Sequence, residues 1–337
     1  EEDELPTDLY YQCLDGDFDY NGNGIYGEYG DGIGGYNIDL YAEVKVGRIS
    51  AETGLEFRNW LDKAMRYDED AATGADYTRG ALFLGEYLGP YETSLATPLM
   101  EQIRLGTQYT GRRDGISALG FADAPDLFDA DLTKTLYDTD ENESWTCDDV
   151  TRAIADGAGI SVINHMGHSN YAYNMRYGND DADALNNENP FFVYSQGCIA
   201  GAFDEDCIAE HFTTSTKYGA FGGVWNSRYG WYSYSRSGVS TSGASQLYHR
   251  YFWDTVFQGD SRAIGYANMM SHEKNAARAL GEPYMRWCYF ETNLFGDPIQ
   301  EICGAAGVVT LDREEYRSDA TMVITYFATR PLTAWGE

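Results

Sequence analysis

The sequence predicts an α/β fold, a mostly parallel β-sheet with helices on both faces, followed by the start of a β-segment. Short apolar runs of strand length alternate along the chain with stretches whose apolar residues recur at helical spacing. Strands that alternate with helices form parallel sheets covered on both faces. From Gly307 the pattern changes, and residues 308–311 and 321–327 alternate like strands.

Composition narrows the possible partners. The 337 residues suffice for one large domain or two smaller ones, and they carry a net charge of −31. Such a surface repels phosphate backbones, which argues against nucleic acid as a partner. No apolar run approaches the roughly 18 residues of a membrane helix.

The N-terminal part predicts two short strands, at 8–13 and 40–47, on either side of a stretch rich in Gly, Asp and Asn. Apolar residues at helical spacing predict an amphipathic helix over 54–67. A polar linker follows at 68–79. We assign residues 1–75 to the C-terminal part of an N-terminal α/β subdomain.

The alternation itself covers residues 76–304, which we expect to form the main domain. Its predicted strands are 81–84, 160–164, 191–195 and 220–225, and its predicted helices are 98–105, 148–155, 206–216, 243–257 and 260–280. The last thirty or so residues, 305–337, are too few to close a β-sandwich of about 100 residues. We therefore expect a β-domain that is cut short.

Two residues follow strands in the same way. His168 comes after an apolar run and Gly167, and Cys198 comes after another apolar run and Gly197. About one βαβ crossover separates them, so neighbouring parallel strands would place both at the same sheet edge. A thiol beside an imidazole is a nucleophile–base pair for covalent catalysis. The alternative is a buried structural cysteine and a capping histidine.

Here the chain resembles caspase-like cysteine peptidases, and the gingipain family most closely. Four ordered segments carry the resemblance: VGRIS at 46–50, YSQGCIAGAF at 194–203 with CIAE at 207–210, NSRYGW at 226–231, and LFGDP at 294–298. The resemblance implies a caspase-like three-layer αβα fold, an Ig-like tail and a secreted or cell-surface cysteine endopeptidase. Cys198 would be its nucleophile and His168 its general base.

The resemblance also implies supporting roles. Glu86 would orient the catalytic histidine, and the backbone N–H groups of Ser169 and Cys198 would form the oxyanion hole, although the family has glycine where this chain has Ser169. The substrate pocket would involve Thr97, Tyr229 and Trp231. Thr97 stands where arginine-selective members carry an acid, so specificity stays open, with Glu92 and Glu101 as other possible acids.

A second motif has the spacing of a calcium loop. Oxygen-bearing side chains recur across residues 17–28 with a glycine at the sixth position, the pattern in which hard ligands converge around Ca²⁺. The candidate ligands are Asp17, Asp19, Asn21, Asn23 and Glu28. Flanking helices are absent, so we expect a structural calcium loop rather than an EF-hand. The alternative is an acidic turn.

The main alternative function is an inactive calcium-binding adhesion or scaffold module with the same fold. Zinc at His165 and His168 lacks a third ligand, and Cys207 is a rival nucleophile on a helix. Cys288 and Cys303 are close enough for a disulfide, but sequence does not fix pairing. We expect peptide or protein substrates, and an upstream pro-segment or separate N-terminal chain as a further partner.

Overall fold

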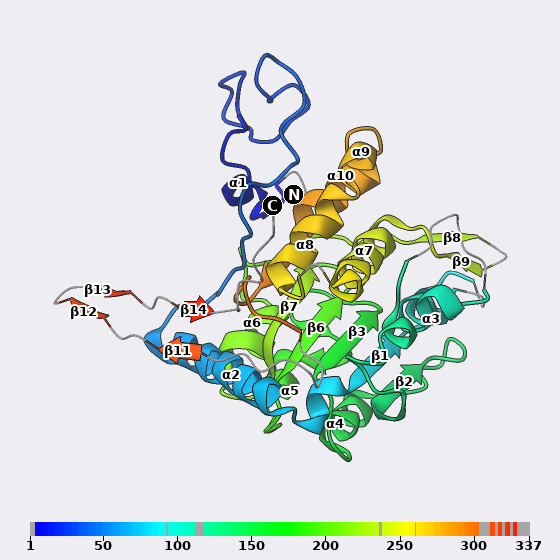
Figure 1. Ribbon diagram of the computed structural model, residues 1–337. Helices are drawn as coiled ribbons and strands as arrows, with labels where there is room; N and C mark the ends of the chain where they lie inside the picture. Colours follow the sequence, from blue (N-terminus) through cyan, green and yellow to red (C-terminus); the bar gives the residue numbers. More distant parts are fainter. Residues whose placement is uncertain are drawn as a thin grey trace, which may run out of the picture.

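The computed structural model describes residues 4–302 apart from 92–93, 112–117, 236–237 and 260, together with four short strands in the tail. A six-stranded sheet lies at its centre, in the order β10-β7-β6-β3-β1-β2 (Figure 1). The strands are β1 (Ala81–Gly85), β2 (Thr133–Tyr137), β3 (Val162–Met166), β6 (Phe191–Ser195), β7 (Ala220–Asn226) and β10 (Thr292–Phe295). All neighbours pair in parallel except β10 and β7. The predicted mostly parallel sheet is confirmed.

The sheet separates two hydrophobic clusters. Strand residues alternate between its faces, so Phe192 and Tyr194 join one cluster while Phe191 and Val193 join the other. Helices α2 (Gly54–Thr73), α3 (Thr97–Leu105), α7 (Ala244–Gln258) and α8 (Ile264–Glu273) bury side chains in the first cluster. Helices α4 (Cys147–Ala155), α5 (Asn179–Asp183) and α6 (Ile208–Glu210) do so in the second. The result is a three-layer αβα sandwich.

Helix α2 is longer than its predicted range. It begins with a reciprocal capping box between Thr53 and Glu56, and it ends where Gly74 adopts a left-handed conformation with φ 72°. Trp60 and Tyr67 pack from α2 onto the sheet, and the ring of Tyr67 stacks on Phe221 at 4.1 Å. The predicted linker at 68–79 is therefore wrong in its first part, because packing carries the helix to Thr73. Within the described residues, no helix is long and apolar enough to cross a membrane.

The N-terminal strands are also wrong. The predicted strand at 8–13 is the helix α1 (Leu9–Gln12), in which Leu9 and Cys13, one helical turn apart, share a buried cluster. No strand covers 40–47, where Leu40 alone inserts into that cluster. Residues 8–43 form a lobe that projects from the helical layer (Figure 1).

Several elements escaped prediction. The range 260–280 contains two helices, α8 and α9 (Ala276–Ala279), and α10 (Pro283–Glu291) follows. Two hairpins add β4 (Tyr173–Asn174) with β5 (Tyr177–Gly178), and β8 (Ser233–Ser235) with β9 (Gly238–Ser240). In the tail, β11 (Leu311–Arg313) pairs with β14 (Tyr326–Ala328), and β12 (Tyr316–Ser318) pairs with β13 (Thr321–Val323). The Ig-like assignment and the domain boundaries stay predictions, and residues 308–310 lie outside the described part.

Candidate active site

The register of β3 and β6 decides where the two candidate catalytic residues lie. These parallel strands pair His165 with Ser195. His168 and Cys198 each come three positions after this pair, just beyond the carboxyl ends of neighbouring strands about 4.8 Å apart. The structure thus places both residues at one edge of the sheet, where parallel α/β sheets bind ligands.

A buried hydrogen-bond network joins the ends of three strands below this edge. Glu86 follows β1, and its Oε2 accepts the backbone N–H of His168 at 3.0 Å. Its Oε1 faces Nε2 of His165 at 3.1 Å. Burial alone would raise the pKa of Glu86, but the hydrogen bonds from His165 and from the His168 backbone outweigh it and hold the pKa below its usual range. Glu86 is therefore a carboxylate, and it fixes the segment that carries His168.

The third strand enters the network through Ser195. Its Oγ accepts hydrogen bonds from Nδ2 of Asn174 at 2.9 Å and from the N–H of Gly197 at 3.1 Å. The hydroxyl proton is left for Nδ1 of His165, 2.9 Å away. His165 therefore carries its proton on Nε2 and donates it to Glu86. Because Ser195 and His165 are fully buried, this Ser-His-Glu arrangement is a support for the site rather than a catalytic triad.

Steric contacts explain why a glycine precedes each of the two candidate catalytic residues. A Cβ on Gly167 would lie 2.3 Å from Cδ of Glu86, and a Cβ on Gly197 would lie 2.0 Å from Oγ of Ser169. That Ser169 hydroxyl donates to the carbonyl of Cys198 at 2.8 Å, which ties the His168 segment to the Cys198 segment. The Gly-His and Gly-Cys pairs seen in the sequence are thus requirements of packing below the site.

Gln196, the first residue of the Gln-Gly-Cys motif, points into the core. Its Nε2 donates to Nδ1 of His249 at 2.6 Å, and Nε2 of His249 donates to Oδ1 of Asn164 at 2.7 Å. Burial keeps the pKa of His249 well below its ordinary value, so this imidazole is neutral. Gln196 consequently anchors the loop that carries Cys198 to helix α7.

The thiol of Cys198 is partly buried and lies 3.9 Å from the carbonyl oxygen of Gly230. Burial is the main cause that raises its pKa to about 11; the hydrogen bond to the Gly230 carbonyl opposes this rise, and the nearby Glu291 contributes to it. The thiol of the free protein is thus protonated at neutral pH. Ile199 follows in the left-handed region with φ 63°, a strained conformation for a β-branched residue, and its N–H donates to the carbonyl of Arg228 at 2.7 Å.

Two backbone donors belong to the segments that carry His168 and Cys198. In the part of the chain that the structure describes, neither the N–H of Ser169 nor that of Cys198 donates to a protein acceptor. Two such donors at a sheet edge can stabilise a developing oxyanion. The oxyanion hole formed by Ser169 and Cys198, with Ser169 in place of the family's glycine, stays a prediction.

The contact between Glu86 and His168 differs from the expected one, in which the carboxylate would orient the catalytic imidazole. The carboxylate of Glu86 binds the backbone of His168, while its ring contact is with His165. The His168 side chain is exposed, and its imidazole forms no hydrogen bond with any described residue. Glu86 therefore positions the main chain of His168 and leaves its ring free to rotate.

A cavity of about 370 Å³ lies beside the loop that contacts Cys198. Trp231 lines it, together with Arg278, Glu282 and Tyr284 from the other wall, and the rings of Trp231 and Tyr284 lie 4.4 Å apart. The predicted pocket residues Thr97 and Tyr229 are not among its lining residues. The carbonyl of Tyr229 instead accepts the indole N–H of Trp287 at 2.9 Å.

The remaining candidate pocket residues lie on helix α3 and just before it. Thr97 is the first residue of α3 and carries no charge. Glu101 is neutralised by Arg104, whose two nitrogens approach it at 2.6 and 2.7 Å, so it does not offer a free acid to a basic substrate side chain. Glu92 lies outside the described residues.

The side chains of the predicted calcium loop form hydrogen bonds with other groups of the same loop. Oδ1 of Asp17 accepts the N–H of Asp19 at 3.0 Å, and Oδ1 of Asn21 accepts that of Asn23 at 2.9 Å. Nδ2 of Asn23 donates to Glu28 at 2.7 Å, which joins the middle and the end of the loop. A separate group of carboxylates, Asp15, Asp39 and Glu43, has oxygens within 4.8 Å of one another nearby. The oxygen donors of the loop suit a hard cation in type.

Sequence reasoning missed part of the site. The roles of His165, Ser195 and Asn174 depend on strand pairing, and no motif signals them. Tyr284 and Met285, which line the cavity, belong to α10, a helix that was not predicted. Cys207 is fully buried, and burial raises the pKa of its thiol, so the rival nucleophile is inaccessible. Cys288 is a free, buried thiol, while Cys303 lies outside the described residues.

Comparisons with known proteins agree with this architecture. A model of the family described as peptidase family C25 matches residues 1–302. The chain is similar to the Arg-specific cysteine proteinase gingipain R, with a TM-score of 0.55 and 16% identity over 82% of this chain and 60% of that one. It is also similar to the Porphyromonas gingivalis complex of RgpB pro- and mature domains, with a TM-score of 0.55 and 18% identity over 87% and 64%.

A third structure, titled only as a protease, gives a TM-score of 0.58 and 16% identity over 94% of this chain and 64% of that one. The chain thus spans about three fifths of the length of the solved structures it matches. At these identities the likeness establishes the fold. No curated protein matches the chain in sequence.

Proposed function

Because the chain belongs to peptidase family C25, a family of cysteine peptidases, we propose that it is an endopeptidase with Cys198 as nucleophile and His168 as general base. The observation that carries this proposal is the pairing of β3 with β6. It brings the residue after Gly167 and the residue after Gly197 to equivalent positions beyond two neighbouring parallel strands.

The chemistry follows from the state of the thiol. With its pKa raised to about 11, the Cys198 thiol needs a base to become a nucleophile at neutral pH. The exposed His168 imidazole, free to rotate toward the thiol, would take the proton as the substrate binds. The thiolate would attack the scissile carbonyl, and the N–H groups of Ser169 and Cys198 would stabilise the oxyanion. His168 would then protonate the leaving amine, and water would release the acyl group.

The test compares two cysteines that lie nine residues apart in sequence. A fluorogenic peptide library should be cleaved by the wild-type protein, and Cys198→Ala should lower kcat by about 10³-fold or more. Cys207→Ala removes a buried thiol that does not reach the site, so its kcat should stay within about twofold of wild type. Full activity in Cys198→Ala would overturn the mechanism. Inactivity of the wild type would favour the adhesion or scaffold module instead.

We also propose that residues 17–28 bind a structural calcium ion. The support is chemical: Asp17, Asp19, Asn21, Asn23 and Glu28 supply oxygen donors, and the Asn23–Glu28 contact holds two distant loop positions together. Bound calcium would neutralise the clustered carboxylates and stabilise the N-terminal lobe by linkage. A location outside the cell or on its surface, where calcium is plentiful, accords with this role.

Thermal unfolding tests the calcium proposal. Tm should rise when calcium is added after EGTA treatment, and Glu28→Gln should remove most of that rise. Asp62→Asn, which removes an exposed carboxylate on α2, should leave the calcium-induced rise intact. Equal rises in all three proteins would place the ion elsewhere.

A further inference from the structure

The N-terminal lobe, residues 8–43, presents an unusual surface. It contains eight carboxylate side chains and seven tyrosines, and the first lysine, arginine or histidine of the sequence is Lys45. All seven tyrosines are more than half exposed, from 52% for Tyr20 to 77% for Tyr36. They are Tyr10, Tyr11, Tyr20, Tyr26, Tyr29, Tyr36 and Tyr41. A concentration of exposed aromatic side chains on one small lobe points to an interaction surface.

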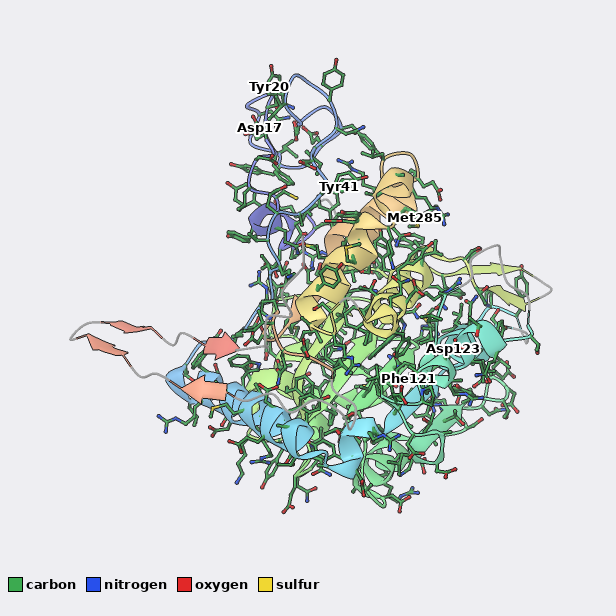
Figure 2. The ribbon with its side chains drawn as sticks, viewed as in Figure 1. Asp17, Tyr20, Tyr41, Phe121, Asp123 and Met285 are labelled. Carbon is green, nitrogen blue, oxygen red and sulfur yellow. The ribbon has the colours of Figure 1, made fainter. Side chains whose placement is uncertain are left out.

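The tyrosines are exposed even though the lobe contributes other side chains to a hydrophobic core. Phe18, Ile38 and Leu40 are buried and join a cluster with Leu247 of α7 and Tyr289 of α10. The lobe is therefore anchored by aliphatic and phenylalanine side chains, while its tyrosines face outward. Figure 2 shows Asp17 and Tyr20 on the outer part of the lobe and Tyr41 nearer the helical layer.

The charge of the lobe is largely uncompensated. Among the described residues, Arg48 pairs with Asp8 at the base of the lobe. No described cation forms an ion pair with Asp15, Asp17, Asp19, Asp39 or Glu43. Such a surface attracts cations and repels nucleic acid and anionic membranes.

The lobe already holds one arginine of its own chain. The guanidinium of Arg286 lies 4.3 Å from the ring centroid of Tyr29 and donates to the carbonyl of Gly27 at 2.8 Å. This contact combines an aromatic face with a backbone oxygen, a general way to hold a guanidinium. Tyr20, Tyr26 and Tyr36 are also more than half exposed on this carboxylate-rich lobe.

Helix α10 connects the lobe to the candidate active site. Arg286 contacts the lobe, while Tyr284 and Met285 line the cavity shared with Trp231. Trp287, the next residue, holds the carbonyl of Tyr229, one residue before Gly230, whose carbonyl faces the Cys198 thiol. Helix α10 therefore contacts both the lobe and the loop beside Cys198.

We propose that the lobe is an exosite that binds lysine- and arginine-rich segments of the peptidase's protein substrates. This inference rests on the proposed peptidase function, but the binding surface can be tested without catalysis. Tyrosine faces would stack on guanidinium and ammonium groups. The carboxylates outside the proposed calcium loop, Asp15, Asp39 and Glu43, would attract them over a longer range.

The binding experiment uses the full chain carrying Cys198→Ala, with a fluorescent arginine- and lysine-rich peptide and a glutamate-rich counterpart as probes. The basic peptide should bind, more weakly at high salt. The triple variant Tyr20→Ser, Tyr26→Ser, Tyr36→Ser should weaken binding about tenfold, at roughly a factor of two or more per tyrosine. Asp15→Asn with Asp39→Asn should also weaken it and reduce its salt dependence.

The matched control lies on α2. Asp62→Asn with Glu69→Gln removes the same charge from exposed positions, and Leu55→Ser removes an exposed apolar side chain. These controls should keep wild-type affinity. Equal losses in lobe and control variants, equal binding of the glutamate-rich peptide, or unchanged affinity in both lobe variants would each overturn the proposal.

A catalytic experiment separates the exosite from the peptidase function. One cleavable peptide is extended with either a basic or an acidic tail. With the wild-type protein the basic tail should lower KM about tenfold at unchanged kcat, and the tyrosine variant should lose that advantage while cleaving the acidic-tailed peptide normally. An advantage that persists in the tyrosine variant would overturn the exosite. Absence of all cleavage would refute the peptidase proposal alone, since the binding experiment would still decide the lobe.

Discussion

One oxygen of Glu86 accepts the backbone N–H of His168, and its other oxygen faces the ring of His165. The carboxylate therefore links His165, within β3, to the backbone of His168, just after this strand. Through His165 the network extends to Ser195 below Cys198. It acts on His168 through the main chain. The same contact makes Glu86 a positioning residue whose removal should be felt in catalysis.

Glu86→Gln should lower kcat by roughly 10²-fold with little change in KM. The amide cannot accept from both the His168 backbone and the His165 ring, so one of these donors loses its partner. Peptide hydrolysis measures the effect, and thermal unfolding checks that the fold persists. Glu188→Gln, an exposed glutamate, should behave like wild type. Wild-type kcat in Glu86→Gln would show that the network does not position the base.

Gly197→Ala should abolish most activity, because its Cβ would lie 2.0 Å from Oγ and 2.9 Å from Cβ of Ser169. The clash pushes the Cys198 loop away from the His168 segment. Adding Ser169→Gly removes both of those atoms, so the double variant should recover part of the lost kcat/KM. Ser169→Gly alone measures what the hydrogen bond to the Cys198 carbonyl contributes. No recovery in the double variant would mean that the glycine serves another purpose.

The buried ion pair between Arg176 and Asp138, beside the site, should contribute strongly to the free energy of unfolding. Arg176 donates to Asp138 at 2.6 Å, and Asp138 also accepts the N–H groups of Tyr87 and Ser144. Arg176→Met should lower the free energy of unfolding by roughly 3–5 kcal/mol, because it leaves a buried carboxylate unpaired. Urea unfolding measures this. Adding Asp138→Asn should restore much of the loss, and strict additivity of the two changes would contradict the coupling.

The raised pKa of Asp68 predicts that the free energy of unfolding depends on pH. Burial raises its pKa to about 6 in the folded protein from 3.8, so the folded state holds the proton more tightly. The stability that this contributes is present below pH 3.8 and is lost as the pH rises through 6. Asp68→Asn should therefore raise the free energy of unfolding at pH 7 by about 1–2 kcal/mol, after allowance for partial exposure, and change it little at pH 3. Asp62→Asn, exposed on the same helix, should show no such window.

Four strands of the central sheet, β1, β3, β6 and β7, were predictable because their sequences are short, mostly apolar runs, whereas β10 was not predicted. Runs such as 191–195 are apolar throughout, and in the structure every residue of β6 is buried. Strand β2 was missed since it lies at the edge of the sheet and none of its residues is fully buried. A strand was predicted at 8–13, but Leu9 and Cys13, one helical turn apart, pack into one cluster and the segment is a helix.

The sequence by itself determined the strand–helix alternation, the two strand ends that carry His168 and Cys198, and the acidic, tyrosine-rich N-terminal segment. These features depend on residue type and on local spacing. Only the tertiary structure decided that Glu86 binds the backbone of His168, that His165 and Ser195 brace the site, and that α10 lies between the lobe and Cys198. Those relationships join residues far apart in the chain, and they exist only once strand register and packing have been fixed.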